Sequence, residues 1–169
     1  MQSVPPILIA LTLFGSASRA TTQEDVVVYL VRHAERAEDG SNDPPISQEG
    51  WDRAQLLSDM LRDAGITHVH VTSFRRARET AVPLVARTRA PLSIYDPDDL
   101  EAFAAELRRT PGRHLVVGHS NTTSELVGAL GGDPGSTIEE SEYDRLYVVM
   151  PRGTEPRSVL LRFGAPPRG

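Results

Sequence analysis

The sequence contains no cysteine and no lysine. Without cysteine, the chain cannot form disulfides, a thiolate nucleophile or a cysteine-ligated zinc site. Without lysine, it has neither an amine for Schiff-base chemistry nor the lysine of a phosphate-binding P-loop. All 18 basic residues are arginine. These absences leave histidine, arginine, hydroxyl and carboxyl groups to carry the chemistry.

Positive charge is also in short supply, since 23 acidic residues outnumber the 18 arginines and give a formal net charge of -5. Sequence-independent nucleic-acid binding needs a basic face, so we expect no nucleic-acid partner. A local group of arginines can still form an anion site within an acidic chain. The length of 169 residues fits one domain that buries its core without disulfides or a structural metal.

The apolar run near the N-terminus, Ile7–Phe14, is too short to cross a bilayer. Small residues at Ser18 and Ala20 follow it and match a signal-peptidase site. We predict a signal peptide over residues 1–20 and a single domain over residues 21–169. The protein would then be periplasmic or secreted, with no stable membrane span after cleavage. The alternative interpretations are an uncleaved anchor and an unstructured leader.

Apolar, β-branched runs alternate along the chain with segments in which apolar residues recur every three or four positions. We predict strands over residues 26–31, 68–72, 92–95, 114–118, 145–150 and 158–163. Helices are predicted between Ser47 and Gly65, over 73–87 with a kink or break at Pro83, over 97–109, and over 122–130. This alternation implies an α/β fold with a mainly parallel sheet of about six strands and helices on both faces.

Three of the predicted strands lead into histidine or arginine residues. Arg32 and His33 follow the first strand, Arg76 follows the second, and His119 follows the fourth. In open α/β sheets, ligand groups gather beyond the carboxyl ends of the strands, so these side chains should meet at one edge. Guanidinium groups hold phosphate oxygens with a planar fork of donors, and nearby helix N-termini add backbone N–H groups. The combination suits a dianionic phosphoryl group.

A neutral imidazole can attack phosphorus directly and form a covalent phosphohistidine. An unperturbed pKa of about 6.5 allows the neutral form around pH 7. The remaining groups would hold the equatorial oxygens while charge redistributes. The scheme requires no metal and no cofactor.

Four motifs occur in a fixed order along the chain. They read Arg32-His33-Ala34-Glu35, Ile46-Ser47-Gln48-Glu49-Gly50, Thr72-Ser73-Phe74-Arg75-Arg76-Ala77-Arg78-Glu79-Thr80-Ala81 and Leu115-Val116-Val117-Gly118-His119-Ser120. Together they resemble the motifs of the histidine phosphatase superfamily, in its phosphoglycerate-mutase-like branch. The resemblance covers most of the chain that follows the predicted signal peptide.

By this resemblance, His33 is the nucleophile, and Arg32, Arg76 and His119 bind the phosphoryl oxygens. Ala34 stands where the family has glycine, and alanine still allows close approach of the backbone. The family's proton donor usually lies after the third strand. This chain offers four acidic residues there, and we assign the role to none of them: Asp96, Asp98, Asp99 and Glu101.

Other polar residues have both a functional and a structural interpretation. His68 and His70 would share a strand face and form a zinc pair, but no third ligand has obvious spacing. His114 is interpreted as structural. Glu35 would either orient the arginine and histidine that precede it or be only a charged loop residue. Arg75, a neighbour of the motif arginine, is interpreted as a surface charge, as is Arg78.

The residues around Ser120 argue against two further classes. Ser120 stands where the acid-phosphatase branch of the superfamily has aspartate, which argues against a close relationship to that branch. The stretch around it also resembles the nucleophile elbow of serine hydrolases. That motif needs glycine two residues after the serine, where this chain has Thr122.

We therefore expect a phosphatase that hydrolyses phosphate monoesters through a phosphohistidine intermediate on His33. Only one short helix separates the third predicted strand from the fourth, which predicts an open site similar to that of compact phosphohistidine phosphatases. The predicted export favours a small phosphorylated substrate or a phosphoprotein outside the cytoplasm. The alternative is a catalytically weak module on the same fold that binds phosphate or phosphoproteins, and the unassigned proton donor is its support.

Overall fold

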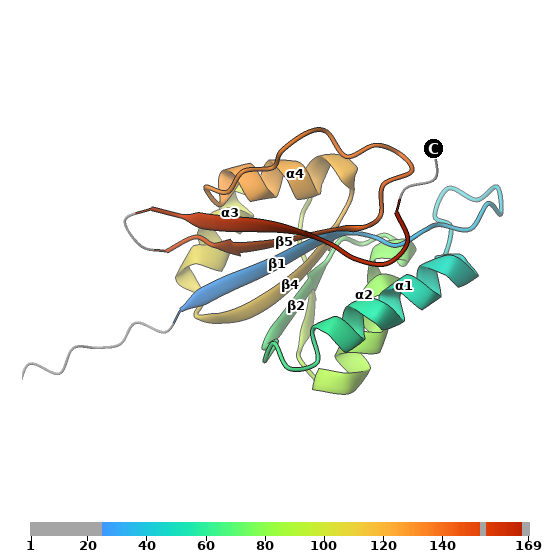
Figure 1. The fold of residues 1–169 in the computed structure, drawn as a ribbon, viewed down its shortest axis with the longest axis horizontal. Helices are drawn as coiled ribbons and strands as arrows, with labels where there is room; N and C mark the ends of the chain where they lie inside the picture. Colours follow the sequence, from blue (N-terminus) through green and yellow to red (C-terminus); the bar gives the residue numbers. More distant parts are fainter. Residues whose placement is uncertain (1–24, 153–154, 167–169) are drawn as a thin grey trace, which may run out of the picture.

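A six-stranded sheet runs through the centre of the chain (Figure 1). This computed structural model describes residues 25–152 and 155–166, so the predicted signal peptide lies outside the described residues. The strands are β1 (Val26–Arg32), β2 (His68–Val71), β3 (Leu92–Ile94), β4 (Gly112–Gly118), β5 (Arg145–Met150) and β6 (Arg157–Arg162). The helices are α1 (Gln48–Met60), α2 (Arg75–Thr88), α3 (Leu100–Arg109) and α4 (Ser120–Ala129). Within the described ranges, no helix combines the length and the apolar character that a membrane span needs.

The strands lie side by side in the order β3-β2-β4-β1-β5-β6. The first four strands of the chain are parallel to one another. β5 and β6 then extend the sheet beside β1 as an antiparallel pair. The predicted α/β fold with a mainly parallel sheet is therefore confirmed. Because β1, β2 and β4 are parallel neighbours, the residues that follow them emerge at one edge of the sheet.

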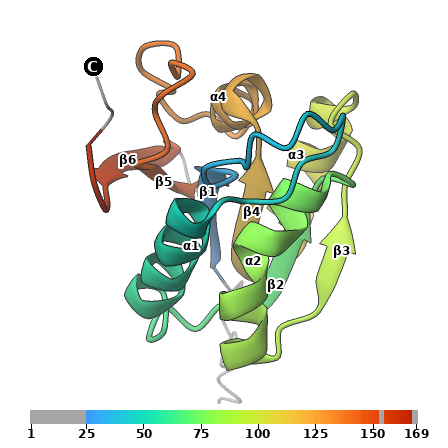
Figure 2. The ribbon, with the colours of Figure 1, turned by 90° about the vertical axis from the view of Figure 1, so that its right-hand side faces the viewer.

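Alternating side chains of the strands supply two separate cores. Val28 and Leu30 of β1 pack with α3 and α4, whereas Val31 packs with residues of α1 and α2. Figures 1 and 2 show these two helix pairs on opposite faces of the sheet, as expected from the sequence. Because both faces are covered, β1 is apolar up to Arg32, and β4 is apolar over Leu115–Val117 before it ends at Gly118. The residues at their ends therefore project from a fully packed layer.

Local sequence signals set the helix ends close to the predicted positions. The Ser47 hydroxyl accepts a hydrogen bond from Gly50 N and so caps α1. α3 begins at Leu100 rather than at residue 97, because the Asp99 carboxylate accepts a hydrogen bond from Ala102 N at the cap. α2 is one helix that includes Pro83, so it does not break there.

Two motif glycines lie where backbones approach too closely for a side chain. A Cβ atom on Gly50 would stand 2.4 Å from the carbonyl oxygen of Glu35, so the first turn of α1 rests on the chain that leaves β1. A Cβ atom on Gly118 would stand 2.8 Å from the Tyr95 hydroxyl and 2.9 Å from Thr122 Oγ1. Glycine is the residue that permits such contacts. Both contacts fix segments that border the edge described next.

Candidate active site

The sheet itself brings His33 and His119 together. β1 and β4 pair in parallel with Arg32 opposite Gly118, so each histidine follows its strand at the same level. The backbone N–H of His33 continues the ladder by donating to the carbonyl of Gly118 at 2.9 Å. The two imidazole rings lie with their centroids 5.3 Å apart and their planes at 66°. Two residues that are distant along the chain thus lie side by side at one edge of the sheet, as the strand ends predicted.

Arg76 completes this group from the first turn of α2. Its Nε–H donates to Nε2 of His33 at 3.1 Å. Its guanidinium also lies over the ring of Phe74, 4.4 Å from the centroid. Of the three neighbouring arginines in this motif, Arg76 is therefore the one that contacts the histidine. Arg75 is exposed and pairs with Glu79, which agrees with its interpretation as a surface charge.

The partners of His33 define its tautomer. Its Nδ1 lies 2.8 Å from the carbonyl oxygen of Ala34, which can only accept a hydrogen bond. Its Nε2 receives the Nε–H of Arg76, which can only donate. We therefore assign the ring proton to Nδ1 and the lone pair to Nε2. The lone pair faces the guanidinium group at which an anion would bind.

Thr80 links the backbone after His33 to α2. Its hydroxyl accepts the N–H of Ala34 at 2.9 Å and donates to the carbonyl of Arg76 at 2.7 Å. Thr80 is almost fully buried, so this connection is sheltered from water. The four-residue spacing of Arg76 and Thr80 in the motif thus has a structural reason: it places the hydroxyl one helical turn behind the arginine.

His119 is held between β2 and the start of α4. Its Nε2 and Thr72 Oγ1 share a hydrogen bond of 3.0 Å, and its backbone N–H donates to Thr122 Oγ1 at 2.9 Å. The edge of the Phe74 ring packs against it, with centroids 5.1 Å apart. His119 is the N-cap residue of α4, so the positive end of that helix lies beside the two histidines.

Burial keeps both histidines of the site neutral. The pKa of His33 is lowered to about 3, mainly by burial; the nearby Arg32, Arg76 and His119 contribute to this shift, and the hydrogen bond to Ala34 opposes it. Burial and the two arginines likewise lower the pKa of His119 to about 4. A neutral His33 is the form that can attack phosphorus. The site therefore holds a nucleophile that needs no deprotonation at neutral pH.

Arg32 is fixed by a loop from the far end of the chain. Its Nη1 donates to the carbonyls of Glu139, Glu140 and Glu142 at 2.9, 2.9 and 3.0 Å. Its guanidinium stacks 4.2 Å above the ring centroid of Tyr143. In the described part of the chain, its Nε is buried and has no hydrogen-bond partner. An oxygen of a bound anion would supply the acceptor that this N–H lacks.

Two carboxylates approach the arginines, and sequence reasoning missed both of them. Asp43 Oδ1 lies 3.7 Å from Nη1 of Arg76. Glu140 Oε2 lies 3.4 Å from Nη2 of Arg32 and belongs to an exposed side chain. Asp43 lies in the charged loop after β1 and Glu140 in the loop before β5, and neither carries a motif that would single it out. Only the fold brings them to the site.

The four acidic residues offered as proton donors lie apart from this group. The carboxylate of Asp99 caps α3, and that of Asp96 accepts the N–H of Asp98 at 2.9 Å. No hydrogen bond or ion pair between described residues joins them or Glu101 to His33 or His119. Asp43 and Glu140 are thus the better placed candidates.

Glu35 pairs with Arg53 and does not orient Arg32 or His33, the functional role considered for it from the sequence. Its carboxylate pairs with Arg53 of α1, with Nε at 2.9 Å and Nη2 at 2.7 Å from Oε1. Arg53 also donates to the carbonyl of Phe163 at 2.8 Å. Glu35 therefore ties the loop after β1 to α1 and the C-terminal segment, and it orients neither Arg32 nor His33.

The other three histidines form a stack within the neighbouring strands β2 and β4. The rings of His68 and His114 lie 4.7 Å apart, and those of His70 and His114 lie 5.3 Å apart. Both ring nitrogens of His70 are hydrogen-bonded, Nε2 to His114 Nδ1 and Nδ1 to Ser93 Oγ. His114 is fully buried and also bonds the Thr110 carbonyl, which fits a structural role. Among the described residues, no group of three or more His, Asp or Glu side chains could hold a metal ion.

We expect neither His33 nor His119 to titrate near its ordinary pKa. In the free protein, NMR signals of both rings should stay unchanged from about pH 8 to 5, whereas an unperturbed imidazole has its midpoint near about 6.5. Because the folded-state pKa values are lowered, the unfolded chain takes up these protons first, and stability should decline as the pH falls below about 6.5. A midpoint between about pH 6 and 7 for His33 would contradict the burial argument.

Residues 28–101 match the model of a family described as the histidine phosphatase superfamily (branch 1). This range includes three residues of the site: Arg32, His33 and Arg76. Among curated proteins, the chain is 29% identical over 121 residues to the probable phosphoglycerate mutase GpmB of Yersinia pestis. That alignment covers 68% of this chain and 54% of the relative, so the chain spans about half the length of this relative.

Solved structures share the fold over most of the chain. The protein histidine phosphatase SixA in complex with tungstate superposes with a TM-score of 0.65 at 20% identity, covering 80% of this chain and 96% of that one. The alpha-ribazole phosphatase from Shigella flexneri superposes with a TM-score of 0.68 at 16% identity, covering 81% of this chain and 96% of that one. At these identities the likeness concerns the fold.

Proposed function

Because the chain belongs to the histidine phosphatase superfamily, we propose that it hydrolyses phosphate monoesters through a phosphohistidine intermediate on His33. The observation that carries the proposal is the geometry of His33. Its Nε2 lone pair faces Arg76 at 3.1 Å, its ring lies 5.3 Å from that of His119, and its pKa is lowered far enough to keep it neutral.

In the first step, Nε2 of His33 attacks phosphorus and the bond from phosphorus to the ester oxygen breaks. The phosphoryl group is then bonded to Nε2, and the leaving oxygen takes a proton. The three equatorial oxygens carry the charge, and they would be held by Arg76, His119 and the unpartnered Nε–H of Arg32. In the second step, water attacks phosphorus, the bond to Nε2 breaks, and inorganic phosphate leaves.

The leaving oxygen needs a proton from a carboxylic acid or from water. Asp43 and Glu140 are the candidates, because each carboxylate approaches one of the arginines that would hold the phosphoryl group. Esters with a good leaving group need little protonation, whereas alkyl phosphates depend on an acid. A comparison of Asp43→Asn with Glu140→Gln on an alkyl phosphate therefore identifies the donor.

Solved structures with this fold support a small phosphorylated substrate or a phosphoprotein. SixA, named as a protein histidine phosphatase, is covered almost completely by this chain, as is the alpha-ribazole phosphatase. The tungstate in the SixA complex is an oxyanion, which agrees with the anion site inferred here. We favour hydrolysis over mutase activity because both of these solved structures are named as phosphatases.

The test is turnover of p-nitrophenyl phosphate and of a phosphohistidine peptide by the purified chain, together with its affinity for tungstate. We expect turnover of at least one substrate and competitive inhibition by tungstate. Tungstate binding without any turnover would support the alternative, a catalytically weak module that binds phosphate or phosphoproteins. Absence of both would contradict the proposal and the alternative together.

We also propose that the protein is exported and acts in the periplasm or outside the cell. The support is the apolar run Ile7–Phe14 with small residues at Ser18 and Ala20. Mass spectrometry of the protein recovered from the cell envelope should give a chain that starts at residue 21. Recovery of the full-length chain from the cytoplasm would overturn this proposal and leave the catalytic one intact.

A further inference from the structure

The loop before β5 surrounds the side chain of Arg32. We call residues 136–144 the clamp loop, because three of its backbone carbonyls converge on Nη1 of Arg32. Its Tyr143 ring lies flat against the same guanidinium. Backbone carbonyls that are not paired in a sheet or helix are normally left to water. Here they fix the orientation of Arg32, which has an exposed fraction of only 6%.

The clamp loop is in turn held by the carboxylate of Glu142. Its Oε2 accepts hydrogen bonds from the backbone N–H of Glu139 at 3.0 Å and from Nη2 of Arg145 at 2.7 Å. Its Oε1 accepts from Arg145 Nε at 3.2 Å and from Arg162 Nη1 at 2.7 Å. Four donors thus surround one buried carboxylate, and one of them belongs to a residue whose carbonyl holds Arg32.

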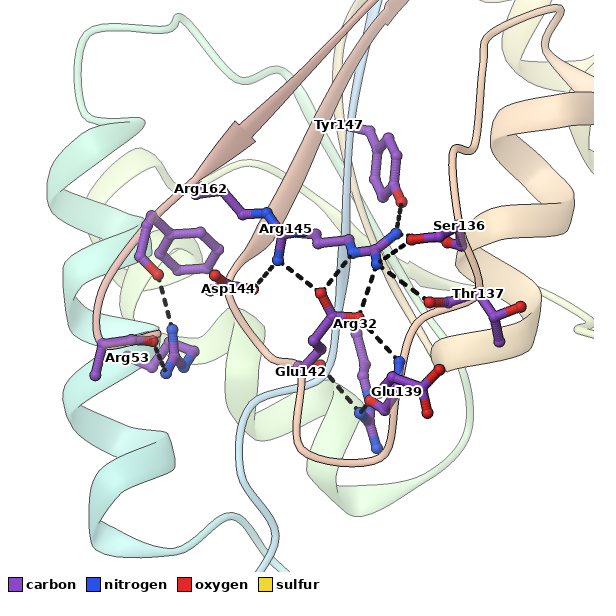
Figure 3. A network of polar contacts seen from close by, with 12 residues as sticks. Arg32, Arg53, Ser136, Thr137, Glu139, Glu142, Asp144, Arg145, Tyr147 and Arg162 are labelled. Atoms are coloured by element: carbon purple, nitrogen blue, oxygen red, sulfur yellow. Dashed lines mark hydrogen bonds and ion pairs between the residues drawn. The ribbon is translucent and has the colours of Figure 1, made fainter. Parts of the chain in front are cut away.

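Arg145 connects this carboxylate to the start of the loop. Its Nη1 donates to the carbonyl of Ser136 at 2.6 Å and to the Tyr147 hydroxyl at 3.1 Å. Its Nη2 donates to Ser136 Oγ at 3.0 Å and to the Thr137 carbonyl at 3.1 Å. Every nitrogen of this guanidinium therefore has a partner. Figure 3 shows the network as one connected set that runs from Tyr147 to Arg32.

Charge keeps the network assembled at neutral pH. Burial by itself would raise the pKa of Glu142, but the Glu139 N–H and the guanidinium groups of Arg145 and Arg162 outweigh it and lower the pKa to about 2. A fork of guanidinium donors on a carboxylate also fixes direction as well as distance. The loop is thus pinned at both ends of its turn, near Ser136 and at Glu142.

The consequence for Arg32 is a restriction on which of its donors can meet a substrate. Nη1 is used by the three carbonyls, whereas Nε has no partner in the described residues and Nη2 has one long contact to an exposed carboxylate. The Nε and Nη2 donors lie on one edge of the guanidinium. We propose that Glu142 and Arg145 are positioning residues that hold the clamp loop so that Arg32 presents this edge to the phosphoryl group.

This proposal rests on the proposed phosphatase function, but it can be tested through anion binding alone. A buried ion pair can also serve stability only, because removal of one partner leaves an uncompensated charge. A positioning role and a purely stabilising role of Glu142 differ in whether the effect of its replacement on anion affinity depends on Arg32. If Glu142 acts through Arg32, its replacement should have no further effect once the Arg32 side chain is gone.

The experiment is a double-mutant cycle with Glu142→Gln, Arg32→Ala and the combined variant. Tungstate affinity by calorimetry and the kcat and KM for p-nitrophenyl phosphate are the measurements. Leu107→Ala is the matched control, since it truncates a fully buried side chain of α3 that shares a core with Ile138 of the clamp loop but makes none of the loop's hydrogen bonds. It should lower Tm and leave those hydrogen bonds in place. Arg145→Lys serves as a second variant should Glu142→Gln fold poorly, because it keeps the charge and loses the fork of donors.

We expect Glu142→Gln to weaken tungstate binding about tenfold, and to have less than about a twofold effect in the Arg32→Ala background, as coupled neighbours do. Leu107→Ala should lower Tm and leave tungstate affinity unchanged. Equal losses in both backgrounds, or a loss of affinity in Leu107→Ala that follows its Tm, would overturn the positioning role. Because affinity is measured without turnover, a protein that binds tungstate but hydrolyses nothing would refute the phosphatase function while leaving this test valid.

Discussion

Replacement of His33 by asparagine is expected to lower kcat for p-nitrophenyl phosphate by about 10⁴-fold or more, as loss of a catalytic nucleophile does. Asparagine retains a polar side chain of similar size but cannot form the phosphorylated intermediate. The fold should tolerate it, because the ring is held by hydrogen bonds to Ala34 and Arg76 that an amide can partly replace. Steady-state kinetics and thermal melting, measured together, separate the loss of chemistry from a loss of structure.

Single-turnover reactions stopped with an alkaline denaturant, in which a phosphohistidine survives, give the second measurement on this variant. The wild-type protein should retain label from a radioactive phosphoryl donor as an acid-labile phosphohistidine. The His33→Asn variant should carry no label. His68→Asn is the control, because His68 begins β2 at the opposite end of the parallel strands. It should keep both turnover and label. Label that persists in His33→Asn would mean that another residue accepts the phosphoryl group.

The second large effect is expected for Arg76→Ala, which should lower kcat/KM by about 10²- to 10³-fold. Such a loss is typical when one preorganised donor to a developing negative charge is removed. Arg76 also donates to Nε2 of His33, so its removal leaves the nucleophile less well oriented. Lysine should restore only part of the activity, because its ammonium group is a point charge without the planar fork of donors.

Arg75→Ala is the matched control for this prediction. Arg75 is the preceding residue in the same helix, carries the same charge, and is exposed in an ion pair with Glu79. Its loss should change kcat/KM by less than about twofold, as expected for a surface substitution. Equal effects of the two substitutions would show that the arginines act through general positive charge. They would then contradict the specific contact between Arg76 and His33.

The periodicity of apolar residues predicted the fold, because it reports on local physics. Buried parallel strands must be apolar on both faces, and helices that cover them must be apolar on one side. The helix ends lie close to the predicted positions, but two details of the helices were not predicted. α3 begins after its cap residue Asp99 rather than at Pro97, and α2 continues through Pro83 as one helix. These ends depend on which of several neighbouring capping groups finds a partner, and that partner is chosen by packing.

The sequence predicted those residues of the candidate site that lie in motifs following strands. His33, Arg76 and His119 fall into this class, and the structure brings all three together. The acidic residues after β3 did not join them, and Glu35 proved to pair with Arg53. A short segment of sequence does not reveal which carboxylate an arginine will meet, because many acidic residues are equally close along the chain.

By itself, the sequence determined the sheet, the helices that cover it, and the strand ends at which two histidines and two arginines emerge. Only the tertiary structure decided the chemical state of those groups. The tautomer of His33 follows from Ala34 and Arg76, and its lowered pKa follows from burial by the whole fold. Arg32 is oriented by carbonyls 107 to 110 residues further along the chain. Such contacts carry no local signal, because their energies arise only when distant segments have already packed.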